Sequence, residues 1–102
     1  MAESYVSKLL KGKSIEKCEY ISGIVIDFGN NCILGCNEDS FFSKGSAVLP
    51  CEEVIGLRFV DFLEKEELEI FVFDANVTLN IPLLYLENWV YKNNEGVIMV
   101  ST

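Results

Sequence analysis

The sequence predicts a mainly β fold of the α+β kind: two similar antiparallel three-stranded meanders packed as a sandwich or half-barrel, with a short N-terminal helix and a short helix between the meanders. Three observations lead to this prediction. Every second residue is apolar over 24–28 and 77–81, next to a turn at 29–31 whose residues tolerate positive φ and a second turn at 74–76. The pattern of the first half recurs in the second. Half of the 102 residues are hydrophobic, enough for a substantial core.

Two segments are predicted to be short helices. The first runs from Tyr5 to Gly12, because apolar residues four apart share one side and lysines occupy the last turn, where the helix dipole favours cations. The second runs from Pro50 to Gly56, with proline at its start, acids in its first turn and glycine at its end. Each helix therefore precedes one meander.

A weak internal repeat connects the two halves. Residues 12–18 parallel 56–62, since in each a glycine precedes apolar residues three and six positions later. Residues 26–34 parallel 71–79, so a single inserted residue aligns both copies. Two copies are too few for a solenoid and suit two sheet modules that close on each other, although chance recurrence of strand–turn–strand patterning is the alternative. The expected modules, within a single domain covering 1–102, are about 12–36 and about 56–81.

Three further segments complete the prediction. Residues 37–46 are expected to be the loop between the modules. Residues 83–94 show no decisive pattern. Residues 96–101 read as a last strand, and Pro82 ends the strand before it because proline donates no ladder hydrogen bond.

Cysteine use and hydropathy indicate a reduced protein of the cytoplasm. The N-terminus lacks a secretory leader and no apolar run is long enough to cross a membrane, so no membrane association is expected. The cysteines are then best interpreted as buried thiols, and Cys32 and Cys36 share a strand face with Leu34. With no histidine to complete a zinc site, no metal and no cofactor are expected.

The charge distribution favours a basic protein partner over nucleic acid. The net charge is −8 and histidine is absent, so the commonest acid–base catalyst is missing and we expect no enzyme. Residues 1–17 carry four lysines against two glutamates, a balance of +2, which leaves −10 for the other 85 residues. Phosphate would repel this surface, whereas a basic cleft would attract it.

Two acidic segments are candidates for contact with such a partner. The densest acidic stretch surrounds the turn between the first two strands of the second module, and its plainer interpretation is a solvated hairpin. In 37–46, two adjacent phenylalanines flanked by acids either pack into the core as part of a short strand or anchor an interface. The candidate contact residues are Glu38, Asp39, Phe41, Phe42, Asp61, Glu64, Glu66, Glu67 and Glu69.

Short motifs resemble those of immunity proteins from bacterial contact-dependent growth inhibition and related polymorphic toxin systems. They are Leu-x-Gly-Lys-x-Ile at 10–15 and the strand–turn motifs at 28–30 and 73–83, although Ala75 stands where asparagine or glycine is expected. The resemblance implies a cytosolic, non-catalytic inhibitor that binds a cognate toxin domain, often a nuclease. It carries over no binding residue.

Two other classes of function stay open from the sequence. One is a structural or assembly adaptor that forms homodimers through open sheet edges, which two meanders leave to be protected. The other is a small ligand-binding domain, which would need a polar pocket. The oligomeric state expected is a monomer or a weak homodimer.

Overall fold

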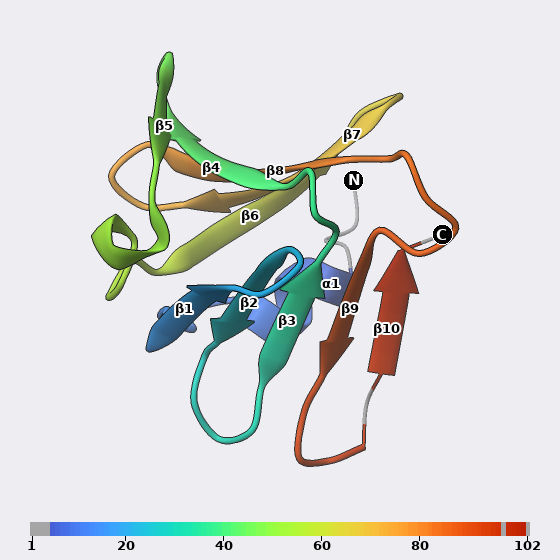
Figure 1. The fold of residues 1–102 in the computed structure, drawn as a ribbon. Coiled ribbons are helices and arrows are strands. Elements are labelled where there is room, and N and C mark those ends of the chain that lie inside the picture. The colour runs from blue at the N-terminus through green and yellow to red at the C-terminus, as the bar shows by residue number, and fades with distance from the viewer. Residues whose placement is uncertain (1–4, 97, 102) are drawn as a thin grey trace.

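The computed structural model describes residues 5–96 and 98–101 and shows two five-stranded antiparallel sheets packed against each other (Figure 1). The predicted mainly β, sandwich-like fold is confirmed. The elements in chain order are α1 (Tyr5–Leu10), β1 (Lys17–Tyr20), β2 (Ile24–Asp27), β3 (Ile33–Cys36), β4 (Phe41–Lys44), β5 (Ala47–Leu49), η1 (Cys51–Glu53), β6 (Phe59–Glu64), β7 (Leu68–Phe73), β8 (Val77–Pro82), β9 (Trp89–Lys92) and β10 (Ile98–Ser101).

Each sheet combines a meander from one half of the chain with a hairpin from the other. The first sheet has the order β1-β2-β3-β9-β10, and the second has the order β5-β4-β8-β7-β6. The two predicted three-stranded meanders are therefore present as β1–β3 and β6–β8. The exchange of the β4–β5 and β9–β10 hairpins between the sheets, visible in Figure 1, extends each meander to five strands.

The exchange is regular, as expected for two halves related by an approximate two-fold axis. Tyr91 of β9 pairs with Leu34, and Phe42 of β4 pairs with Leu79, the repeat equivalent of Leu34. The segments that precede β1 and β6 also pair with each other, through a bridge between Ser14 and its own repeat equivalent, Arg58. Both copies of the sequence repeat thus adopt the same local structure.

The two predicted turns are confirmed. Asn30 and Asn31 have φ of 54° and 63°, and their equivalents Ala75 and Asn76 have φ of 59° and 60°. Asparagine adopts this left-handed conformation readily because its side chain hydrogen-bonds locally, whereas the Cβ of alanine lies close to the following carbonyl oxygen. Ala75 is exposed, so its side chain contributes no packing in return.

Replacing Ala75 by glycine is expected to stabilise the protein by about 0.5–1 kcal/mol, because glycine adopts positive φ without a steric penalty. Urea denaturation measures the change. Ala47→Gly is the matched control: Ala47 is exposed in β5, where glycine is expected to destabilise by a similar amount. A loss of stability in Ala75→Gly would contradict the left-handed turn.

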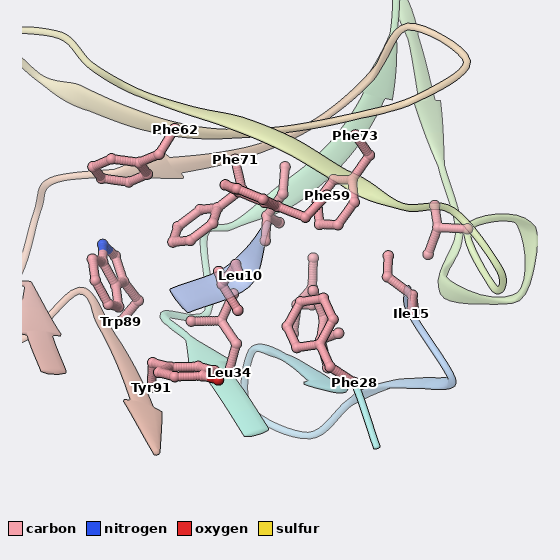
Figure 2. Packing of buried hydrophobic residues seen from close by; sticks show 14 of the residues in the cluster. Leu10, Ile15, Phe28, Leu34, Phe59, Phe62, Phe71, Phe73, Trp89 and Tyr91 are labelled. Carbon is pink, nitrogen blue, oxygen red and sulfur yellow. The ribbon is translucent and has the colours of Figure 1, made fainter. Parts of the chain in front are cut away.

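Aromatic rings from both sheets form the centre of the core (Figure 2). Phe71 is fully buried, and its ring centroid lies 4.9 Å from that of Phe62 and 5.3 Å from that of Trp89. Phe59 and Phe73 continue the cluster, with centroids 6.0 Å apart in an edge-to-face arrangement. Edge-to-face contacts of this kind add to the stabilisation from apolar burial.

Two segments differ from their predicted structure, and a third, for which the sequence predicted none, contains a strand. Residues 37–46 are not one loop, because Phe41–Lys44 forms β4 on β8; this long-range pairing has no local signal. Between Pro50 and Gly56 only one 3₁₀ turn forms, at Cys51–Glu53. The ambiguous 83–94 contains β9. The predicted last strand is present as β10, while residue 97 lies outside the described residues.

Candidate functional site

Three of the predicted contact residues lie at the tip of the β6–β7 hairpin. Glu64, Glu66 and Glu67 are exposed, and the turn is closed by a hydrogen bond from Lys65 N to Leu68 O (2.8 Å). Glu67 O also accepts a hydrogen bond from Leu83 N (3.1 Å). The hairpin tip is thereby joined to the segment that follows β8.

The other two acids of this stretch have intramolecular partners. Asp61 is exposed at a bulge in β6, and its Oδ1 accepts hydrogen bonds from its neighbour Phe62 N (2.8 Å) and from Ser7 Oγ (3.4 Å). Glu69 is half-buried, and its Oε1 accepts hydrogen bonds from Trp89 Nε1 (2.9 Å) and Ser101 Oγ. Glu69 therefore links β7 of one sheet to β9 and β10 of the other.

Replacing Glu69 by alanine is expected to lower the free energy of unfolding by about 2–3 kcal/mol, because two buried donors lose their acceptor. Chemical denaturation followed by the fluorescence of Trp89, the single tryptophan, measures the loss. Glu66→Ala is the control and should stay within about 0.5 kcal/mol of the wild type, since Glu66 is exposed. Equal effects of the two changes would contradict a structural role for Glu69.

Glu38 and Asp39 form a second acidic group between β3 and β4. The Tyr85 hydroxyl donates to Asp39 Oδ2 (2.6 Å) and also lies 3.0 Å from Glu38 Oε1. The Tyr20 hydroxyl donates to Glu38 O (2.6 Å). Hydrogen bonds to Asp39 and Glu38, in that order, raise the pKa of Tyr85, so Tyr85 stays protonated and holds the two carboxylates side by side.

Residues 83–88 lie between these two acidic groups, and Asn88 fixes their conformation. Asn88 Oδ1 accepts hydrogen bonds from Leu84 N and Tyr85 N (3.0 Å each), and its Nδ2 donates to Tyr85 O (3.0 Å). Asn37 ties the segment to β8, because its Nδ2 donates to Asn88 Oδ1 (3.3 Å) and to Pro82 O (2.7 Å). The result is a rigid loop that exposes two leucines, Leu84 and Leu86, the latter 90% exposed.

We refer to this region as the acidic face. The sequence did not predict the apolar centre of this face, because residues 83–94 lack periodicity and the role of Asn88 depends on contacts across the fold. The run of leucines that follows Pro82 was the available signal. The acidic face consists of Glu38, Asp39, Glu64, Glu66, Glu67, Leu84, Tyr85 and Leu86.

The two adjacent phenylalanines have opposite environments. Phe42 is 1% exposed and packs against Phe73, with ring centroids 6.1 Å apart. Phe41 is 39% exposed. The core interpretation therefore applies to Phe42, whose side chain is withdrawn from the outer surface, and the interface interpretation is left to the exposed Phe41. Alternation along β4 is the physical reason.

A groove of about 430 Å³ opens beside Phe41, between β1 and the β4–β5–η1 region. Cys18 and Cys51 lie in it, with Sγ atoms 2.6 Å apart. Burial, followed by the hydrogen bond with Cys51, raises the pKa of the Cys18 thiol, and burial does the same for Cys36. Cys18 and Cys36 are therefore protonated at neutral pH. The groove is lined by Cys18, Glu19, Tyr20, Ile24, Ser40, Phe41, Phe42, Val48, Leu49, Pro50, Cys51 and Glu52.

Comparison of the chain with protein-family models, with characterised proteins and with solved structures gives no match in any of the three. Over residues 5–96 and 98–101, no helix has both the length and the apolar character needed to cross a membrane. In the same described part of the chain, no three His, Cys, Asp or Glu side chains are grouped as a metal site requires. The acidic face and the groove beside it are thus the features on which a functional proposal rests.

Proposed function

We propose that this protein is a non-catalytic immunity protein of the cytoplasm. In this proposal it binds and neutralises a cognate basic toxin domain, and the toxin is a nuclease. The observation that carries the proposal is the arrangement of the acidic face. Exposed carboxylates of the hairpin tip and of the Glu38–Asp39 pair lie on either side of the rigid, leucine-exposing segment 83–88.

This arrangement suits a protein interface, in which an apolar centre is desolvated and a charged rim stays wet. Carboxylates on the rim resemble the phosphates that a nuclease cleft attracts. They would accelerate encounter with a basic partner, and they would select against acidic ones. The exposed Leu86 and Tyr85 supply the apolar and aromatic contacts that hold the complex once it has formed.

Co-expression with the protein encoded beside its gene tests the proposal. We expect a stable complex on size-exclusion chromatography with light scattering, and restored growth of cells that produce the toxin domain. The expected complex dissociates faster when Leu86 is replaced by aspartate, since Leu86 is 90% exposed and its replacement leaves the fold intact. A neighbouring gene for a metabolic enzyme, or a basic neighbouring protein that does not bind, would refute the proposal.

A homodimeric adaptor is the second candidate. The observation in its favour is the open architecture: β1 and β10 are the outer strands of the first sheet, and β5 and β6 those of the second. Outer strands present backbone groups to which another chain can pair. Mass measurement over a range of concentrations separates the two functions, because a stable dimer without a basic partner supports the adaptor alone.

A further inference from the structure

The two sides of the sandwich are closed in different ways. On one side α1 packs against β6, and the crevice left between α1 and the β9–β10 hairpin, among Val6, Leu9, Leu10, Trp89, Tyr91 and Met99, is too small to admit water. On the other side η1 packs near β1, and the groove of about 430 Å³ remains open. The fold thus has one filled side and one unfilled side.

The repeat shows that α1 and η1 occupy equivalent positions. After α1, Lys13 N donates to Leu10 O (2.9 Å); after η1, Leu57 N donates to Val54 O (3.2 Å). Leu10 and Val54 are both fully buried, and both turns continue through a glycine with positive φ. The single turn of η1 replaces a six-residue helix, so less apolar volume enters the side that it closes.

Two pairs of equivalent side chains add to the difference. Trp89 and Ser40 are equivalent, because Trp89 lies two residues before Tyr91 in β9 and Ser40 lies two residues before Phe42, the equivalent of Tyr91, in β4. Phe62 and Cys18 are equivalent in the repeat. The rings of Trp89 and Phe62, 6.0 Å apart, pack against each other on the closed side (Figure 2), whereas the small side chains of Ser40 and Cys18 at the equivalent positions leave the groove open.

The rim of the groove carries negative charge. Glu19 and Glu52 are exposed among its lining residues, and Tyr20, also in the lining, donates its hydroxyl hydrogen to Glu38 of the acidic face. The groove is therefore continuous with the acidic face. Its interior is apolar, through buried residues such as Ile24 and Phe42, and its surroundings attract cations.

We propose that this groove receives bulky apolar side chains from an amphipathic, lysine- or arginine-rich helix of the partner protein. The helix α1 is the internal model for such an occupant: its buried side carries Val6 and Leu10, and Lys8 lies in its last turn. The inference rests on the proposed binding of a basic protein and specifies where that protein is anchored. The groove volume lies toward the lower end of the range of about 300–1,000 Å³ found for binding pockets, which suits a few large side chains.

A peptide titration tests the groove without the toxin. The probe is a synthetic amphipathic helical peptide with tryptophan and leucine on one side and lysine on the other, added to isotope-labelled protein and followed by amide NMR. We expect shifts at Tyr20, Ser40 and Val48. Peptides with serine in place of the apolar residues, or glutamate in place of lysine, should bind at least tenfold more weakly. Equal binding of the serine peptide would overturn the proposal, as would shifts of these amides with protein concentration alone.

Two variants block the groove in different ways. Ser40→Trp places the equivalent of Trp89 in it, and Val48→Arg places a cation on its exposed rim. Each is expected to weaken peptide binding tenfold or more. Ile98→Arg is the matched control, because Ile98 occupies the equivalent position in β10 and is 65% exposed against 68% for Val48. If Ser40→Trp does not fold, Val48→Arg still tests the proposal. Peptide binding by Val48→Arg at the wild-type affinity would refute the groove as the binding site.

The same variants separate this inference from the proposed function. If the cognate toxin domain binds Val48→Arg and wild type equally, the groove is not its anchor and the immunity function stands. If the toxin domain binds neither protein, the immunity function is refuted, and the peptide titration remains as the test of whether the groove binds an amphipathic helix. Tenfold weaker binding of the toxin to Val48→Arg, with Ile98→Arg unchanged, would support both.

Discussion

Replacing Phe71 by alanine is expected to lower the free energy of unfolding by about 3–5 kcal/mol. Phe71 is fully buried where the rings of Phe59, Phe62 and Trp89 meet, so its removal leaves a cavity bounded by both sheets. Domains of this size have total stabilities of about 5–15 kcal/mol, so the variant should be at or near the limit of folding. Urea denaturation followed by Trp89 fluorescence measures the loss.

Leu63→Ala is the control for this prediction. Leu63 lies in β6 and is 41% exposed, so its truncation should change the stability by less than about 1 kcal/mol. A loss below about 1 kcal/mol in Phe71→Ala would mean that the two sheets do not share one packed core.

Reversing two charges at the hairpin tip should have the largest effect on binding. In Glu66→Lys/Glu67→Lys, the rate of association with a basic toxin domain is expected to fall about tenfold or more at low ionic strength, because long-range attraction sets the encounter rate. Dissociation should change less. Stopped-flow or surface plasmon resonance measurements over a range of salt concentrations separate the two rates, and the difference between variant and wild type should shrink as salt is added.

Glu16→Lys/Glu95→Lys is the control pair. Both residues are exposed and lie outside the acidic face and the groove lining, while the change in net charge is identical. If the two double variants slow association equally, total charge governs the encounter and the hairpin has no special part. Unchanged association in Glu66→Lys/Glu67→Lys would remove the hairpin tip from the proposed interface.

The local parts of the fold were predictable from the sequence. Alternation at 24–28 and 77–81 gave the strands, and the asparagines at 30, 31 and 76 gave the turns, because each depends on residues close together in the chain. The exchange of hairpins was not predictable. It depends on pairing such as that of Leu34 with Tyr91, for which neither segment carries a local signal.

The candidate site, like the fold, was predictable only where it depends on residues close together in the chain. The exposed acids at the hairpin tip were identified from composition and turn position alone. The role of Glu69 was not, because its partner Trp89 comes from the other sheet. The loop that exposes Leu86 was also missed, since Asn37 joins Asn88 to Pro82 and only the folded chain brings Asn37 beside that loop.

The exchanged hairpins have a consequence for how the chain reaches its native state. β3 pairs with β2 on one edge, but its other edge has no partner until β9 has been synthesised; β4 pairs with β5 on one edge, and its other edge has no partner until β8 exists. The first half therefore emerges from the ribosome with open strand edges and exposed apolar surface, and we expect neither half to persist as a folded fragment. Because these pairings join distant parts of the chain, folding should be slow for a domain of this length and strongly all-or-none. Arrival of β9 places Trp89 in the core, so its fluorescence should report the committing step.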